Sequence, residues 1–297
     1  MIKKYFKSFN EKEIPYLFFE SSRNDFNNNI VILHGMVEHV NRYEEFGHFL
    51  SVNGYNVYII EIRGHGELRD NLFGDFGKRG IKEVFYDIEI FFNELSSKNG
   101  ISRENTVIFG HSMGALMATK LMIEMKYKNL IISGFSLQKP IFSFIGKIVT
   151  YLERMIIFKK KSTFNKKFRK YNSFFDPIHT KSDWLTRDVD EAIKFVEDDN
   201  CGYPVTPKFF TGIFEMINFI NRNYKKIEKD ARILNLYGTE DKSMDIEHLN
   251  RILSKLRKKK IKINVIANEN GRHESLNEIN KYVIYDEILK WLNEVVK

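Results

Sequence analysis

The sequence predicts an α/β protein with a mostly parallel sheet flanked by helices and an inserted helical cap. Short, nearly continuous apolar runs alternate with longer segments whose apolar residues recur every three or four positions. Such apolar runs are typical of strands covered on both faces, as in parallel sheets. The alternation stops between about residues 135 and 233, where the chain is rich in Phe, Lys and Asn and shows no clear strand pattern, as expected for an inserted lobe.

The first 20 residues are expected to add an antiparallel hairpin at the edge of the sheet. The remaining strands are expected at 29–33, 56–62, 106–109, 130–133, 233–237 and 261–266. Helices are expected at 43–52, 81–97, 249–258 and 282–296, joined to the strands by right-handed crossovers. The predicted division is a core of residues 1–135 and 210–297 and a cap of residues 136–209.

The composition bounds the type of protein. The chain has 297 residues, 43% of them hydrophobic, which is enough for one large core with a smaller lobe. A single cysteine, Cys201, excludes a disulfide framework and suits a reducing compartment. The N-terminal segment has no apolar signal region, and no run of 18 uncharged apolar residues occurs. We therefore expect a cytoplasmic protein, with contact to a membrane surface only at its periphery.

The positive charge is concentrated in one segment. The formal net charge is +8, and residues 139–170 contain ten Lys and Arg but one acidic residue, Glu153. The rest of the chain is nearly neutral. No zinc-finger, RNP-type or helix-turn-helix signature accompanies this charge, so we expect no nucleic-acid partner. The basic segment instead favours contact with an anionic membrane.

The most informative motif is Gly-His-Ser-Met-Gly at 110–114, which has the G-x-S-x-G form. It follows the apolar run 106–109 and precedes 115–125, whose composition favours a helix. A serine on such a strand-to-helix turn projects its hydroxyl clear of the backbone, and the N–H of Met113 points toward a developing oxyanion. Ser112 is therefore a candidate nucleophile. The alternative is a glycine-rich loop without catalytic function.

A nucleophilic serine needs a carboxylate that orients its base. Asp241 follows the strand expected at 233–237, and open α/β sheets place their sites at the carboxyl ends of strands. We prefer it to Glu240 and Asp245, because a short carboxylate directly after a glycine turn is held rigidly. The alternative is that Asp241 only caps the following helix.

The base is expected to be a histidine that follows the acid along the chain. Of the eight histidines, only His248 and His273 do so. His248 lies within a helical pattern and is expected to face solvent. His273 lies in a polar turn after the strand expected at 261–266, where a general base belongs.

The loop after the first buried strand carries the sequence His-Gly-Met-Val-Glu-His at 34–39. The N–H of Met36 is expected to be the second oxyanion donor, and Gly35 allows close approach of the backbone to the substrate. His34 is expected to orient the loop through a side-chain hydrogen bond. Glu38 and His39 could form a metal pair, but no third ligand has a suitable spacing, so we expect no metal and no cofactor. The residues expected to support the substrate pocket are His34, Gly35, Glu38 and His111.

Taken together, these motifs resemble the α/β-hydrolase family of monoacylglycerol lipases and lysophospholipases, which is sometimes grouped with serine aminopeptidases. The matching segments, in the order of the family, are 34–39 with 41–43, 63–66, 110–114, 183–188, 238–241 and 271–274 with 277–278. The resemblance implies an α/β-hydrolase fold with Ser112 as nucleophile, Asp241 as acid and His273 as base. It also implies an oxyanion hole formed by the N–H groups of Met36 and Met113.

Two positions depart from the family pattern. Glu61 occupies a position where the family usually has Asp, and Glu67 follows the 63–66 segment where a small residue is common. Both positions shape a loop and lie outside the triad. The cap is the least family-like part of the chain, and the cap selects the substrate.

The cap contains apolar runs at 140–145 and 148–158, followed directly by Lys159, Lys160 and Lys161. An apolar face with a basic flank suits a monoacyl lipid that enters from an anionic membrane surface. The alternative is that the aromatic residues pack the core of the lobe and the lysines are merely solvated.

We therefore predict a serine carboxylic-ester hydrolase that acts on a monoacylglycerol or a lysophospholipid through an acyl-enzyme. The alternatives are a short-chain carboxylesterase or thioesterase, and an aminopeptidase. A dehalogenase or epoxide hydrolase is disfavoured, because the residue at the turn is Ser112. In a different class, the chain could be a non-catalytic lipid-binding module, against which the intact Ser, Asp and His argue.

Overall fold

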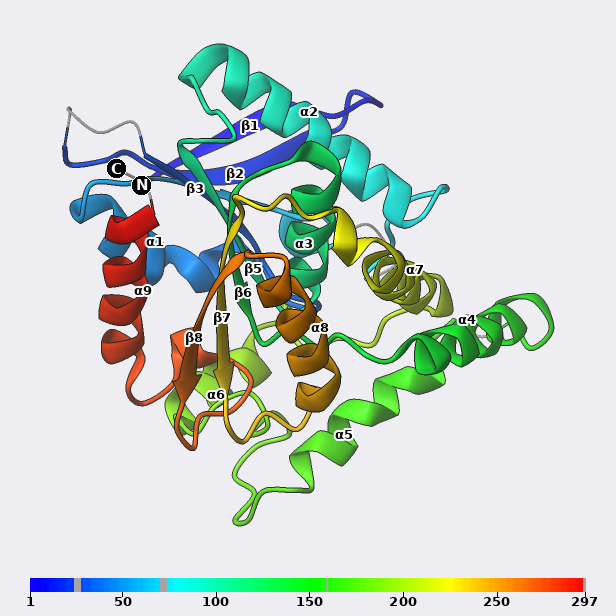
Figure 1. The fold of residues 1–297 in the computed structure, drawn as a ribbon. Coiled ribbons are helices and arrows are strands. Elements are labelled where there is room, and N and C mark those ends of the chain that lie inside the picture. The colour runs from blue at the N-terminus through cyan, green and yellow to red at the C-terminus, as the bar shows by residue number, and fades with distance from the viewer. Residues whose placement is uncertain (24–27, 70–73, 159, 296–297) are drawn as a thin grey trace.

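A single sheet organises the chain in the computed structural model, which describes residues 1–23, 28–69, 74–158 and 160–295. Its strand order is β1-β2-β4-β3-β5-β6-β7-β8 (Figure 1). The strands are β1 (Ile2–Lys7), β2 (Glu13–Phe19), β3 (Asn29–Leu33), β4 (Asn56–Ile60), β5 (Thr106–His111), β6 (Asn129–Ser133), β7 (Arg232–Gly238) and β8 (Lys262–Asn268). β1 and β2 are antiparallel to their neighbours and every other pair is parallel. The predicted mostly parallel α/β sheet and its edge hairpin are confirmed.

The strands differ in how far they are buried. Every residue of β3, β5 and β6 is buried, as the continuous apolar runs predict for the centre of a parallel sheet. The same expectation is wrong for β8, which is mostly exposed, with Val265 at 44%. β8 lies at the edge of the sheet and pairs only with β7, so it is less completely covered.

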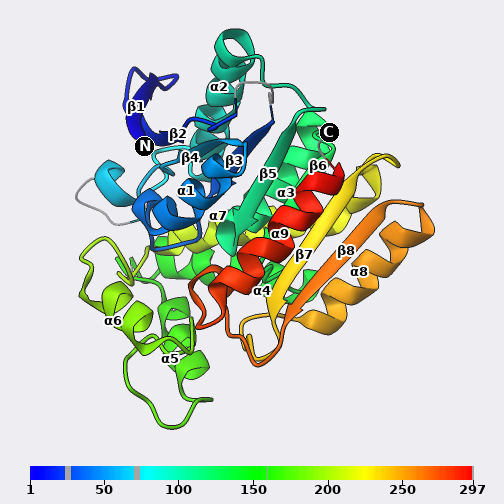
Figure 2. The same cartoon turned by 90° about the vertical axis from the view of Figure 1, so that its left-hand side faces the viewer.

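Helices cover both faces of the sheet (Figure 2). One face is covered by α1 (Glu44–Val52) and α9 (Lys281–Val295), whose rings Phe46 and Tyr285 lie 4.8 Å apart. The other face is covered by α2 (Ile81–Asn99), α3 (Met113–Met125) and α8 (Ile246–Lys258). The expected helices are thus present. Val296, the last residue of one of them, lies outside the described residues. Short 3₁₀ turns occur at η1 (Val40–Tyr43), η2 (Gly66–Leu68) and η5 (Ser275–Asn277).

The segment between β6 and β7 contains helices and loops and no strand among its described residues. It contains α4 (Pro140–Met155), η3 (Thr163–Asn165), α5 (Lys166–Asn172), α6 (Val189–Glu197), α7 (Pro207–Asn223) and η4 (Tyr224–Lys226). The boundary expected between residues 209 and 210 falls within α7, a continuous helix that packs against both α4 and α3. Secondary structure therefore offers no break at that point. Figure 1 shows α4 projecting to one side of the sheet, with α5 below it.

No helix in the described ranges is both long enough and apolar enough to pass through a lipid bilayer.

Candidate active site

A tight turn between β5 and α3 presents Ser112. Its φ is +51°, a left-handed conformation that L-residues rarely adopt, and its N–H donates to the Ser133 carbonyl at 2.8 Å. The flanking residues Gly110 and Gly114 have no room for a side chain. A Cβ on Gly114 would lie 2.0 Å from the carbonyl oxygen of Leu33, and one on Gly110 would lie 2.3 Å from the oxygen of Gly114. The turn therefore directs the serine side chain away from the packed backbone.

The three residues predicted as a triad meet at this turn. Nε2 of His273 lies 3.0 Å from the Ser112 hydroxyl oxygen, and Nδ1 of His273 lies 2.7 Å from Oδ2 of Asp241. Asp241 follows β7 and His273 follows β8, so the carboxyl ends of neighbouring parallel strands bring the residues together. The side chains of His273 and Asp241 are 3% and 1% exposed, which shields their interaction from water.

Asp241 and His273 shift each other's pKa in opposite directions. Burial opposes protonation of His273, but the adjacent Asp241 carboxylate outweighs it and raises the pKa of the histidine. Burial also works against the ionised form of Asp241, but His273 and hydrogen bonds from Ser243 lower the pKa of this carboxyl. Asp241 therefore stays ionised and accepts a hydrogen bond from the Nδ1–H of His273. Nε2 is then free to accept a proton from Ser112.

The alternative acids and the alternative base have other partners. Glu240 forms an ion pair with Lys242. Asp245 caps α8, where its Oδ1 accepts a hydrogen bond from the N–H of His248 at 3.0 Å. The expectation that His248 faces solvent is wrong. Its Nε2 lies 2.8 Å from Oδ1 of Asn221, and this contact ties α8 to α7.

Two backbone N–H groups are available beside the serine. Among the described residues, neither Met36 nor Met113 donates its N–H to a hydrogen-bond acceptor. Both residues line a cavity together with Ser112, and Met113 is the first residue of α3, where the helix dipole is positive. Unsatisfied donors at such a position favour an oxyanion as their partner.

The loop that carries Met36 is held by buried polar contacts. His34 is fully buried, with Nδ1 at 2.8 Å from the Gly35 carbonyl oxygen and Nε2 accepting from the N–H of Ile62 at 3.1 Å. These contacts orient the loop, as expected of His34. His34 does not line the cavity next to Ser112, whereas Gly35 does. A Cβ on Gly35 would lie 2.4 Å from Oε1 of Glu38, so the loop requires glycine there.

Glu61, which stands where the family usually has Asp, contacts a glycine in this region. The Glu61 carboxylate lies against Gly66, where a Cβ would be 2.1 Å from Oε2 of Glu61. Gly66 has a φ of +47°. The longer acidic side chain is therefore accommodated next to a glycine of the 63–66 segment.

A buried ion-pair network joins the Met36 loop to the His273 loop. Arg42 contacts Glu38 at 2.7 Å and binds both carboxylate oxygens of Glu274, at 2.8 and 2.6 Å. Burial would raise the pKa of Glu274, but Arg42 outweighs it and lowers that pKa to about 2. Glu38 also accepts from the Gly35 N–H at 2.5 Å and from the Tyr43 hydroxyl at 2.9 Å. The sequence places these residues in matching motifs but does not indicate that they contact one another.

Two aromatic rings enclose His273. The ring of His111 lies 4.9 Å away, and burial together with the charge of His273 lowers the pKa of His111 to about 4. The indole of Trp184 lies 5.0 Å from His273 with 30° between the ring planes. The Glu274 N–H donates to the Leu185 carbonyl at 2.7 Å, which fixes the Trp184 segment against the base. A positioning role for Trp184 is not evident from the sequence, which offers only the matching 183–188 segment.

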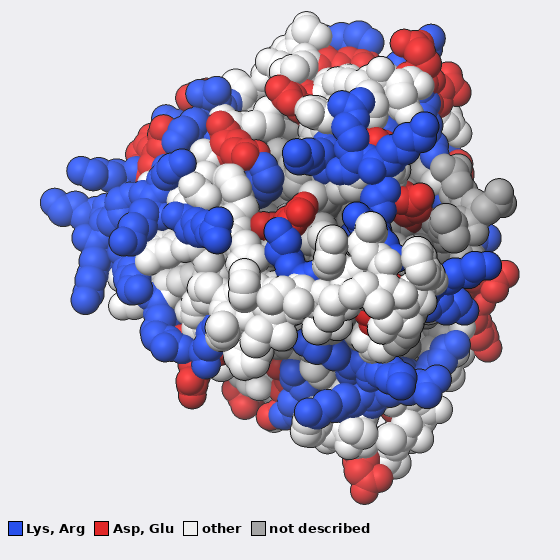
Figure 3. All heavy atoms as spheres, turned by 90° about the vertical axis from the view of Figure 1, so that its right-hand side faces the viewer, with Lys and Arg blue, Asp and Glu red and all other residues white. Residues whose placement is uncertain are grey.

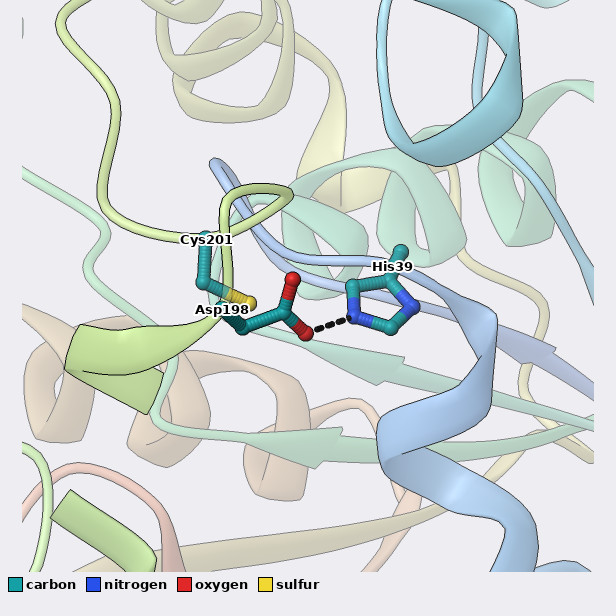
Figure 4. A group of neighbouring side chains, drawn as sticks. All are labelled: His39, Asp198 and Cys201. Carbon is teal, nitrogen blue, oxygen red and sulfur yellow. Dashed lines mark hydrogen bonds and ion pairs between the residues drawn. The ribbon is translucent and has the colours of Figure 1, made fainter. Parts of the chain in front are cut away.

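Glu38 and His39, considered as a metal pair, have different partners. Nε2 of His39 lies 2.6 Å from Oδ2 of Asp198, next to Cys201 (Figure 4). The three donor atoms of His39, Asp198 and Cys201 lie within 4.8 Å of one another, so their types and proximity would suit a metal. The histidine and the carboxylate already satisfy each other, however, and burial raises the pKa of the Cys201 thiol.

Two cavities meet at Ser112. The larger has a volume of about 300 Å³ and is lined by polar as well as apolar residues, including Gly35, Glu38 and His111. The smaller, of about 110 Å³, is lined mainly by apolar and aromatic side chains from α3, α7 and other parts of the segment between β6 and β7, together with a few polar residues that include Lys167. The residues common to both are Met36, Ser112, Phe168, Trp184 and His273. The serine and its base therefore lie at the junction of a polar and an apolar chamber.

The comparisons with known proteins agree with this arrangement. The family model described as "Serine aminopeptidase, S33" (Hydrolase_4) matches residues 25–280. The comparison with curated proteins gives no match.

Similar solved structures include a carboxyl esterase from Bacillus coagulans, with a TM-score of 0.86, 19% identity, and coverage of 100% of this chain and 99% of that one. A monoacylglycerol lipase from Paleococcus ferrophilus has a TM-score of 0.73 and 21% identity, with coverage of 95% of this chain and 99% of that one. A monoglyceride lipase from Saccharomyces cerevisiae has a TM-score of 0.75 and 17% identity, with coverage of 99% of this chain and 95% of that one. At these identities the likeness shows the fold, which is that of the α/β-hydrolases.

Proposed function

Since the chain belongs to the serine aminopeptidase S33 family and is a hydrolase of the α/β-hydrolase type, we propose that it cleaves the carboxylic ester of a monoacyl lipid. The observation that carries the proposal is the hydrogen-bonded chain from Ser112 through His273 to Asp241, at the entrance of an apolar cavity. The substrate class is a monoacylglycerol or a lysophospholipid.

The geometry suits a two-step acyl transfer. Nε2 of His273 takes the proton of Ser112 while Oγ attacks the ester carbonyl carbon. The N–H groups of Met36 and Met113 bind the oxygen that becomes negatively charged. The alcohol leaves with the proton from His273, and a water molecule activated by the same histidine then hydrolyses the acyl-enzyme to release the fatty acid.

The two cavities favour a lipid ester over the alternatives. The smaller cavity offers the acyl chain an apolar lining that includes Leu116, Ile213 and Ile217. An aminopeptidase needs an unpaired carboxylate to bind the substrate's ammonium group. The carboxylates that line the cavities in the described part of the chain are Glu38 and Glu274, and both bind Arg42. A non-catalytic lipid-binding role leaves the buried triad without an explanation.

Helix α4 has an inverted amphipathic pattern that supports a lipid substrate. Its buried residues are small or polar, and three of them, Ser143, Gly146 and Thr150, contact α7. The Ser143 hydroxyl donates to Asn218 at 2.8 Å, and Gly146 faces the ring of Phe214. Its large apolar residues are exposed instead, together with those of the segment that follows it. They are Ile141, Phe142, Phe144, Ile145, Ile148, Tyr151, Leu152, Met155, Ile156, Ile157 and Phe158. We call these residues the α4 apolar surface.

Basic residues border the α4 apolar surface. Figure 3 views the side from which α4 projects and shows a broad uncharged area with Lys and Arg along its margins. Lys160, Lys161, Lys166 and Lys170 follow α4 and form no ion pair among the described residues. Lys159 lies outside the described residues. An exposed apolar area with a cationic border complements an anionic membrane. The protein is therefore proposed to dock on anionic lipid through this surface and to take its substrate there.

The experiment that tests the proposed function combines labelling with a substrate panel. A fluorophosphonate probe should label the wild-type protein and not S112A, while both give the same circular dichroism spectrum. Acyl-chain series of monoacylglycerols and lysophospholipids should be cleaved with a long-chain optimum. A sharp short-chain optimum would instead identify a general esterase, and cleavage of aminoacyl substrates alone would identify an aminopeptidase.

A further inference from the structure

The larger cavity carries two cations at its mouth. Arg169 belongs to α5 and Lys181 to the segment that follows it, and both line the cavity that contains Ser112. We propose that this cavity binds an anionic, phosphate-bearing head group, so that the preferred monoacyl ester is a lysophospholipid with a negatively charged head. The proposal rests on the proposed ester hydrolysis and specifies its substrate.

Neither cation is neutralised by a neighbour. Arg169 and Lys181 are exposed and form no ion pair with any described residue. An arginine binds phosphate oxygens through two parallel N–H donors, and a lysine contributes a compact charge. Ser182 also lines this cavity, and among the described residues its hydroxyl has no hydrogen-bond partner. The cavity lining therefore offers a phosphate group donors of three kinds: a guanidinium, an ammonium and a hydroxyl.

The acidic residues of the same cavity do not cancel this charge. Glu38 and Glu274 are buried, and Arg42 binds both. Their remaining oxygen positions accept hydrogen bonds from Gly35 N–H, Tyr43 and Asn277. The carboxylates are thus held inside the wall by their own partners, while the cations at the mouth are free to bind a ligand.

The position of the cations relative to the serine divides the substrate into two parts. The ester must lie at Ser112, where the two cavities meet, and the acyl chain fits the apolar one. The head group then occupies the cavity with Arg169 and Lys181. A neutral glycerol would leave both charges without a partner there, whereas a glycerophosphate would pair with them.

The test uses short-chain substrates below their critical micelle concentrations, so that attraction to a charged membrane does not contribute. Wild-type kcat/KM is measured for 1-hexanoylglycerol 3-phosphate and for 1-hexanoylglycerol. We expect the phosphate-bearing ester to be preferred. The preference should decrease as salt is raised from about 0.05 to about 0.5 M, because added salt shortens the distance over which exposed charges attract one another.

The variant R169Q/K181Q should lose about tenfold in kcat/KM for the phosphate-bearing ester, mainly through KM, with little change for the neutral ester. The matched control is K255Q/K258Q, which removes the same charge from exposed positions on α8 that line neither cavity. It should retain the wild-type preference. Equal losses in R169Q/K181Q and the control, or a wild-type preference for the neutral ester, would overturn the proposal.

Failure of the underlying ester hydrolysis gives a different result. In that case neither ester is cleaved by the wild type at any salt concentration, and S112A is indistinguishable from it. Cleavage of the neutral ester that depends on Ser112, without a preference for phosphate, would leave the proposed function intact and refute the head-group assignment alone.

Discussion

The hydroxyl of Ser243 lies 3.1 Å from Nδ1 of His273 and 2.7 Å from Oδ1 of Asp241. Its backbone N–H also donates to the same Oδ1, at 2.8 Å. One carboxylate oxygen of Asp241 is therefore held by Ser243, which leaves the other for the histidine. This contact makes Ser243 a positioning residue for the acid.

Replacing Ser243 should slow the reaction without altering substrate affinity. We expect S243A to lower kcat about three- to tenfold, because the backbone N–H still holds Asp241 while the hydroxyl contact is lost. KM should stay the same, and S243T should restore most of the rate. Steady-state kinetics on one soluble ester would measure this. A change in KM with kcat intact would show that Ser243 acts on the substrate and not on the acid.

The acid limb of the pH profile should report His273. The neutral histidine is the base, so kcat/KM falls as the pH decreases through its raised pKa. In D241N the carboxylate that raises this pKa is gone and burial remains, so the limb should shift to lower pH while the plateau rate falls by orders of magnitude. A pH–rate profile of both proteins measures the shift. A limb that stays in place would mean that another group controls it.

Arg42 should contribute strongly to stability. R42M leaves two buried carboxylates without their cation, and we expect a loss of about 3–5 kcal/mol in the free energy of unfolding. Glu274 titrates near 2 in the folded protein, against 4.5 for an unperturbed carboxyl. Its stabilising effect is therefore complete above about pH 4.5 and is lost as the pH falls toward 2.

Urea unfolding at several pH values measures this effect. The decrease in wild-type stability between about pH 4.5 and 2 should be reduced in R42M, because Arg42 is the main group that lowers the pKa of Glu274 and burial alone raises it. Wild-type-like stability in R42M at neutral pH would contradict the network.

The α4 apolar surface should govern vesicle binding. K160Q/K161Q/K166Q/K170Q should weaken binding to phosphatidylglycerol vesicles by about 1 kcal/mol per lysine, and F144S/I148S should weaken binding to anionic vesicles at low and high salt alike. The control I279S/V283S changes exposed apolar residues outside this surface. Co-sedimentation measures binding. Wild-type binding that is insensitive to salt and to lipid charge would indicate solvated lysines instead.

The contact between α4 and α7 should be intolerant of bulk at Gly146. A Cβ at this position would lie 2.5 to 2.8 Å from the ring of Phe214, so G146L should cost roughly 1–3 kcal/mol through overpacking. The neighbouring Ile145 is exposed, and I145L should leave stability unchanged. Thermal unfolding compares the two variants. Equal melting temperatures for G146L and wild type would show that the two helices separate without cost.

The sheet and the three triad residues were predictable because their signals are local. A strand reads as a continuous apolar run, and each of Ser112, Asp241 and His273 lies in the turn that follows one. The order of the strands then brings the residues together. The covering of β8 was not predictable in the same way, because the position of a strand at the edge of a sheet depends on pairing across the whole chain.

Other features depend on contacts between distant segments. The Arg42–Glu274 pair joins residues 232 positions apart, and Trp184 reaches His273 from the segment between β6 and β7. The apolar runs of 140–158 were equally consistent with a packed core or with an exposed face. The decision lies with Ser143, Gly146 and Thr150, whose small side chains allow α4 to lie closely on α7 and turn its large residues outward.

The junction of the two cavities at Ser112 also determines how the products would separate. If the substrate binds as proposed, the alcohol occupies the polar chamber after the first step and the acyl group remains in the apolar one, so the two products lie on opposite sides of Ser112. The departing alcohol vacates the space next to His273, and the water that completes the cycle can enter by that route. Release of the hydrophilic product and entry of water would then be one exchange in the same chamber.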